Sequence, residues 1–66
     1  MEVVINGKPY RAAATLSLAQ AVAVLTDAET GVAAAVNGDV IRRAAWAATP
    51  LSDGDEVEVL TAVQGG

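Results

Sequence analysis

The residues best suited to chemistry stand at the end of the sequence, where residues 61–66 read TAVQGG. A terminal carboxylate on two glycines has no side chains beside it, and only glycine lets the backbone pass closely through a narrow enzyme channel. A carboxylate is a poor electrophile, but an acyl-adenylate supplies a leaving group that a sulfur nucleophile can displace. We therefore predict that Gly66 is a site of covalent modification. The competing interpretations are a frayed terminus without function and a linker remnant.

The composition leaves little other chemistry to the chain. It contains no cysteine and no histidine, which removes disulfides, thiolate metal ligands and the commonest general base. A small chain without cysteine is typical of a reducing, cytoplasmic setting. We expect neither a bound metal or cofactor nor a free-standing enzyme, because 66 residues with one main helix offer little room for a pocket.

The charge pattern also limits the partners. A net charge of −4 argues against nucleic acid, since a polyanion would be repelled and no basic stripe is present. The late acids Asp53, Asp55, Glu56 and Glu58 could suit a partner with a basic face or bind a hard cation. The EF-hand spacing is missing, so a polar turn and a solvated strand are favoured instead. No segment approaches the roughly twenty apolar residues needed to cross a membrane, and Glu2 does not fit a signal peptide.

Two Asn-Gly pairs, Asn6-Gly7 and Asn37-Gly38, predict the hairpins of a sheet. The pair is a strong hairpin signal because a type I′ turn needs positive φ at both central residues. The first pair joins predicted strands over residues 1–5 and 8–14, and Pro9 indicates that the second of these lies at an edge. The second pair joins strands over residues 32–36 and 39–42. A last strand over residues 56–60, or slightly beyond, alternates acids outward with valines inward.

The main helix is predicted to begin after Ser17, which forms a capping box with Gln20. It extends roughly to Thr26, and its apolar stripe follows the i, i+3, i+4, i+7 spacing. That stripe consists of Leu18, Ala21, Val22 and Leu25.

A second, shorter helical segment of one or two turns is predicted over residues 43–48, and Pro50 ends it. Trp46 in this segment is predicted to be a buried anchor of the core. Its alternative role is a stacking partner for Arg43, one helical turn earlier.

The order of these elements predicts an α+β roll in which four or five strands grasp one helix. Residues 1–60 would form the domain, and residues 61–66 a flexible tail. A tail of this length could project about 20 Å, enough to enter the cleft of another protein.

Four motifs, in this order and at these spacings, resemble the ThiS-type sulfur carriers of thiamine biosynthesis, a ubiquitin-like β-grasp family. They are Val36-Asn37-Gly38, Arg43-x-x-Trp46, Leu51-x-Asp53-Gly54-Asp55-x-Val57-Glu58 and Thr61-Ala62-Val63-x-Gly65-Gly66. The resemblance implies a β-grasp roll with a mixed sheet of four or five strands and one main helix on one face. It also implies that Gly66 is adenylated and converted to a thiocarboxylate that donates sulfur for thiazole formation.

The resemblance implies partners as well. A ThiF-like adenylyltransferase, related to ubiquitin-activating enzymes, would use ATP and magnesium, and a cysteine desulfurase system would supply sulfur. A ThiG-like thiazole synthase would receive the charged tail. Val63, Gln64 and Gly65 would thread the active sites of these partners, and the exposed side of the sheet would dock them.

Two other carriers share this outline. The small subunit of molybdopterin synthase is also a β-grasp protein ending in Gly-Gly, but it is usually longer and its tail differs. A ubiquitin-like protein modifier or interaction module is the third interpretation. The segment Ala12–Ala28 is richer in alanine and poorer in charge than is typical of the ThiS-type family, so contacts that the helix makes in relatives cannot be transferred to this chain.

Overall fold

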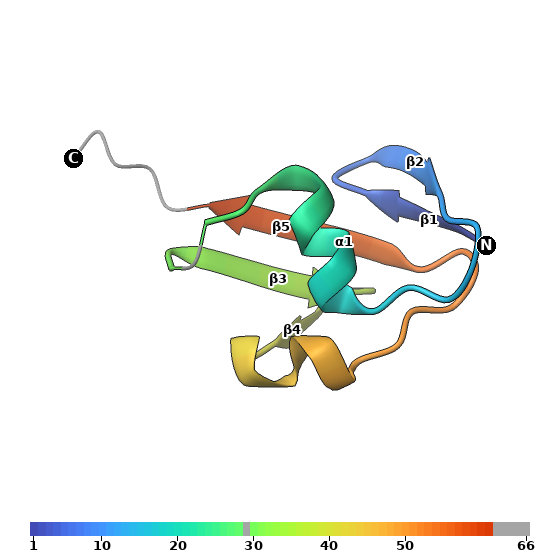
Figure 1. Ribbon diagram of the computed structural model, residues 1–66. Coiled ribbons are helices and arrows are strands. Elements are labelled where there is room, and N and C mark those ends of the chain that lie inside the picture. Colours follow the sequence, from blue (N-terminus) through green and yellow to red (C-terminus); the bar gives the residue numbers. More distant parts are fainter. Residues whose placement is uncertain (29, 62–66) are drawn as a thin grey trace.

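The computed structural model describes residues 1–28 and 30–61. These residues form a five-stranded mixed sheet with strand order β2-β1-β5-β3-β4, an α-helix and a 3₁₀ helix (Figure 1). In chain order the elements are β1 (Glu2–Ile5), β2 (Lys8–Arg11), α1 (Leu18–Leu25), β3 (Val32–Val36), β4 (Asp39–Ile41), the 3₁₀ helix η1 (Arg43–Ala48) and β5 (Glu56–Thr61).

Both Asn-Gly pairs form the predicted turns. The φ angles are +51° and +81° at Asn6 and Gly7, and +50° and +88° at Asn37 and Gly38, which is the sign that a type I′ turn requires at both positions. Strand β2 lies at an edge of the sheet, as Pro9 indicated.

Strand β2 is shorter than the predicted segment of residues 8–14. The Ala12 amide still donates to the Met1 carbonyl at 2.9 Å, and the N-terminal ammonium donates to the Ala12 carbonyl at 3.0 Å. β2 ends at Arg11, which lies opposite Glu2, the first residue of β1.

Strand β5 occupies the centre of the sheet. It runs parallel to β1, with Ile5 opposite Val57, and antiparallel to β3, with Ala34 opposite Val59. It continues through Thr61, slightly beyond residue 60 as predicted. β1 therefore pairs with the first two residues of β5, and β3 pairs with residues 57–61.

Helix α1 begins with the predicted capping box. The Gln20 amide donates to Ser17 Oγ at 3.2 Å, and the Ser17 amide donates to Gln20 Oε1 at 2.8 Å. Leu18, Ala21 and Val22 are buried. Leu25, the last member of the predicted apolar stripe, is also the last residue of the helix and is 48% exposed.

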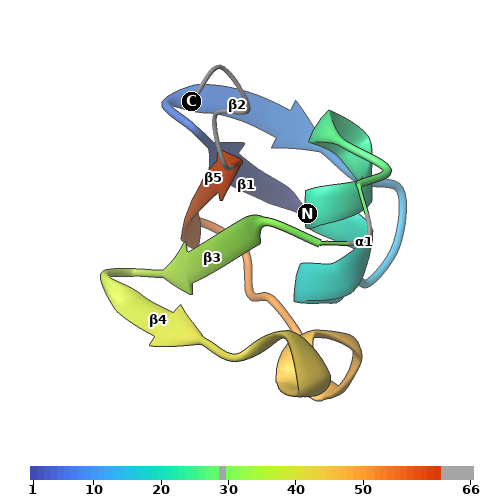
Figure 2. The same cartoon turned by 90° about the vertical axis from the view of Figure 1, so that its left-hand side faces the viewer.

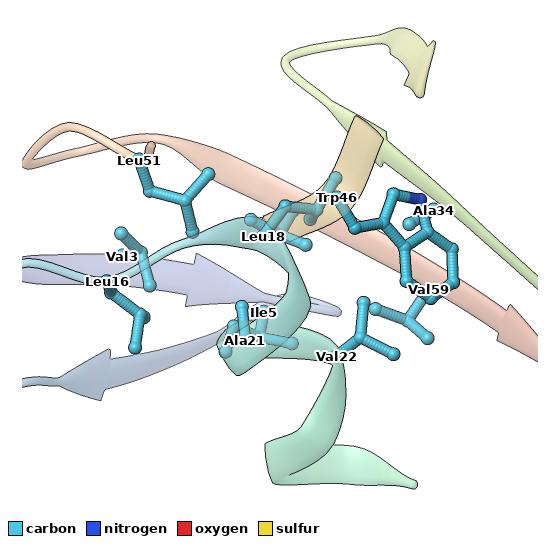
Figure 3. Packing of buried hydrophobic residues seen from close by; sticks show 11 residues of the cluster. Val3, Ile5, Leu16, Leu18, Ala21, Val22, Ala34, Trp46, Leu51 and Val59 are labelled. Carbon is cyan, nitrogen blue, oxygen red and sulfur yellow. The ribbon is translucent and has the colours of Figure 1, made fainter. Parts of the chain in front are cut away.

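Helices α1 and η1 cover the same face of the sheet (Figure 2). The core lies between them and the strands. Figure 3 shows side chains from the sheet and from both helices meeting in it. Its members are Val3, Ile5, Leu16, Leu18, Ala21, Val22, Ala34, Trp46, Leu51, Val57 and Val59. The predicted α+β roll, with one main helix on one face of a mixed sheet, is confirmed.

Trp46 fulfils both roles that the sequence suggested. Its indole is 5% exposed, and Nε1 donates to the Ile41 carbonyl at 2.8 Å. The Arg43 guanidinium carbon lies 5.1 Å from the centre of the ring, within the range of a cation–π contact. The hydrogen bond of Trp46 thus links η1 to the last residue of β4.

Candidate functional site

The predicted site residues Val63, Gln64, Gly65 and Gly66 lie outside the described residues. The structure does describe Thr61, the last residue of β5, which precedes them in the chain. The described part of the candidate site consists of β5 and the exposed face of the sheet around it.

Strand β5 sends its side chains alternately to two surfaces. Val57 and Val59 are buried under the helices, whereas Glu56, Glu58 and Leu60 are exposed on the opposite face. This is the expected period of two along a strand. Leu60 therefore lies on the same exposed face as Glu56 and Glu58, but its side chain is apolar.

Leu60 belongs to an apolar surface that we call the sheet patch, made of Ala33, Ala35, Val40 and Leu60. Ala33 lies opposite Leu60, and Ala35 lies opposite Val40 across the next strand pair. Leu60 is 70% exposed and Val40 is 78% exposed. The two small alanines between them leave a shallow hollow of about 180 Å³, with Glu58 on its lining. An exposed apolar surface beside polar residues is typical of a protein-binding site.

The late acids divide into two groups. Asp53 and Asp55 stabilise the turn before β5: Asp53 Oδ1 accepts from the Glu2 amide at 2.6 Å, and Asp55 Oδ2 accepts from the Ser52 amide at 2.7 Å. Glu56 and Glu58 instead face solvent on the sheet. The turn followed by a solvated strand is confirmed. Within residues 1–28 and 30–61, no group of three or more potential ligands is placed to hold a metal ion.

A second hollow, of about 290 Å³, lies between α1 and η1. Four alanines line it together with Val22, Thr26 and Trp46, and among the residues that the structure describes its charged lining residues are Asp27 and Arg43. Arg43 is already engaged with the Trp46 ring and, at 3.4 Å, with the Ala28 carbonyl. These lining residues do not form an acid–base or nucleophile pair.

The asparagine side chains of both hairpin turns bind β5, which the sequence reasoning missed. Asn6 exchanges two hydrogen bonds with the main chain of Val59, and Asn37 accepts one from the Glu56 amide. The available signal was the choice of asparagine as the first turn residue, since it both tolerates positive φ and offers an amide.

Comparison with known proteins agrees with this geometry. The model of the ThiS family matches residues 3–66. A crystal structure of the thiamine biosynthesis protein ThiS from Geobacter metallireducens is 35% identical over the whole of both chains, with a TM-score of 0.77. A solution NMR structure of a thiamine biosynthesis protein from the same organism is 36% identical over all of this chain and 88% of the other, with a TM-score of 0.80. No curated protein matches significantly.

The fold and the position of β5 thus define a β-grasp protein whose last strand runs through the middle of its sheet. The chain belongs to the ThiS family, the small sulfur carriers of thiamine biosynthesis, which are not catalysts themselves and interact with enzymes of that pathway. No helix in the described ranges is long and apolar enough to span a membrane.

Proposed function

We propose that the carboxylate of Gly66 is the group that carries sulfur. A carboxylate oxygen attacks the α-phosphorus of ATP in an adenylating partner of the ThiF type, and pyrophosphate leaves. The partner uses magnesium with its ATP. The outer sulfur of a persulfide formed by a cysteine desulfurase system then attacks the acyl-adenylate and displaces AMP, which leaves an acyl disulfide. A thiol of the sulfur donor or of a thiol reductant cleaves the S–S bond by forming a new disulfide, and the chain ends in a thiocarboxylate.

Membership of the ThiS family over residues 3–66 is the observation that carries this proposal, because the match includes Gly65 and Gly66. In the next step, a thiazole synthase of the ThiG type takes the charged tail, and the sulfur enters the thiazole ring. Val63, Gln64 and Gly65 thread the active sites, where small side chains and glycine let the backbone pass. The chain is then a co-substrate of both enzymes rather than an enzyme.

The sheet patch is the surface that we assign to docking of these partners. Its support is the exposure of Leu60 and Val40 on the face that the helices leave free. Leu60 also precedes the last described residue of β5, so a partner seated on the patch is close to the point from which the tail begins. Glu56 and Glu58 on the same face favour a partner with basic residues around its own apolar contact.

Intact-mass measurement tests the proposal. The protein is incubated with an adenylating enzyme, ATP, magnesium and a sulfur source, and the expected product has one oxygen replaced by sulfur. A variant lacking Gly66 is the control and should remain unchanged. If the chain that retains Gly66 also shows no mass increase, the carrier mechanism is wrong.

Growth complementation tests the pathway separately. In cells that require thiazole, the chain ending in Gly66 should restore growth and the variant lacking Gly66 should not. Rescue of molybdopterin-deficient cells alone would favour the molybdopterin synthase subunit. Conjugates of the chain on lysines of other proteins would favour a protein modifier.

A further inference from the structure

The side chain of Asn6 continues the pairing between β1 and β5 where the main chain of β1 turns away. The backbone N–H of Asn6 donates to the Val57 carbonyl at 2.9 Å, and the chain then bends at Gly7. From the bend, Asn6 Oδ1 accepts from the Val59 amide at 2.8 Å, and Nδ2 donates to the Val59 carbonyl at 3.1 Å. The side-chain amide therefore takes the place of the next peptide group of β1.

This contact has a structural reason. In a parallel ladder the bonds are evenly spaced along both strands, so a longer β1 would present main-chain groups to Val59. The positive φ of +51° at Asn6 ends β1 before it can do so. An asparagine amide has one acceptor and a donor group at the spacing of a peptide, and it restores the missing pair. Val59 is thereby held two residues before the strand ends at Thr61.

The chain contains a natural counterpart, Asn37. It has nearly the same φ, +50°, and is likewise followed by glycine. Its Oδ1 accepts from the Glu56 amide at 2.9 Å, and its Nδ2 donates to Asp55 Oδ1 at 3.1 Å. Asn37 therefore holds the beginning of β5, whereas Asn6 holds the part that leads into the tail.

We propose that Asn6 is a positioning residue for the sulfur-carrying tail. Without the Asn6 side-chain amide, the segment from Val59 to Thr61 pairs with β3 alone. The segment then leaves the sheet in several directions. Only some of these directions bring the tail to a partner's active site, and apparent affinity falls in proportion to the competent fraction. The chemical step after correct docking is unchanged. This inference rests on the proposed function, because it concerns the same carboxylate.

The matched variants are Asn6→Gly and Asn37→Gly. Glycine adopts positive φ without strain, so each variant removes one side-chain amide and leaves the turn geometry in place. Each loses two hydrogen bonds, and they differ in which end of β5 they release. A general loss of stability would therefore affect both variants alike.

Adenylation kinetics separate the two variants. Pyrophosphate release by the adenylating enzyme is measured over a range of carrier concentrations. For Asn6→Gly we expect KM for the carrier to rise about three- to ten-fold with kcat unchanged, and for Asn37→Gly we expect KM to stay within about two-fold of the wild type. Equal KM values in the two variants, or a loss confined to kcat, would overturn the inference. A wild-type chain that is not adenylated at all would instead overturn the proposed function, and the inference with it.

Hydrogen exchange of the free protein supplies a readout that needs no partner. In Asn6→Gly the Val59 amide should exchange at least about ten-fold faster than in the wild type while the Glu56 amide is unaffected, and the reverse holds for Asn37→Gly. If Asn6→Gly does not fold, Asn6→Asp takes its place in the adenylation kinetics, because aspartate tolerates positive φ, keeps the acceptor for the Val59 amide and lacks the donor to the Val59 carbonyl. Unchanged Val59 exchange in a folded Asn6→Gly variant, or an unchanged KM in Asn6→Asp, would also overturn the inference.

Discussion

Substitution of Leu60 by glutamine should weaken partner binding without unfolding the domain. Complete burial of a leucine side chain contributes about 1.5–3 kcal/mol, and Leu60 is 70% exposed in the free chain. About 1–2 kcal/mol is therefore still available on docking. Since about 1.4 kcal/mol corresponds to a ten-fold change in affinity, Leu60→Gln should raise Kd about 5- to 30-fold. Its free energy of unfolding should change by no more than about 0.5 kcal/mol, as is usual at an exposed position.

Leu25→Gln is the matched control, because it makes the same replacement on the helix side of the molecule. Leu25 is 48% exposed, so the free energy that its buried half contributes to folding is about 1 kcal/mol. The control should lower stability by roughly that amount and leave Kd unchanged. Isothermal titration with the purified adenylating enzyme gives Kd for each variant, and urea denaturation followed by circular dichroism gives the free energy of unfolding.

Leu60→Gln should thus weaken binding and leave stability nearly unchanged, whereas Leu25→Gln should lower stability and leave binding unchanged. A Kd for Leu60→Gln within about two-fold of the wild type, a difference of less than about 0.5 kcal/mol, would refute docking through the sheet patch. Equal weakening by Leu25→Gln would show that the helix side takes part in docking. That result would refute the assignment of the interface to one face.

Further predictions concern the supports of the fold and the charge beside the patch. Ser17→Ala should lower the free energy of unfolding by about 1 kcal/mol through loss of the capping box; an unchanged urea midpoint would contradict this. Trp46→Phe should cost about 1–3 kcal/mol, because it removes the donor to the Ile41 carbonyl and leaves a space in the core; thermal unfolding by circular dichroism measures the loss. Glu58→Gln should slow association with the adenylating enzyme about two-fold at low salt and have little effect at high salt. Stopped-flow rates independent of this charge would refute an electrostatic role.

The local structure was predictable because its causes are local. The Asn-Gly turns, the capping box of Ser17 and the alternation in residues 56–60 each depend on neighbours within a few residues. The placement of β5 between β1 and β3 depends instead on pairing between the two ends of the chain. Turn and strand signals do not report such pairing, and only the family resemblance pointed to it.

The same division applies to the candidate site. Gly66 was predicted from its chemistry and from the resemblance, whereas the contact of Asn6 with Val59 joins residues 53 positions apart and has no local signature. The half-exposure of Leu25 was not predictable from the apolar stripe, because helical spacing gives a direction but does not show where the core ends. Leu60 did carry a signal, since it continues the exposed positions of Glu56 and Glu58 with an apolar side chain.

The two faces of β5 separate the requirements of folding from those of partner binding. Val57 and Val59 meet the helices and are 1% and 5% exposed, so their truncation costs stability of about 1–3 kcal/mol. Glu58 and Leu60 lie on the other face, where substitution changes what a partner meets. Because a strand alternates its side chains strictly, one short segment can serve both purposes without sharing a residue between them. The main chain of β5 remains the common element, and it is the main chain at Val59 that Asn6 holds in place.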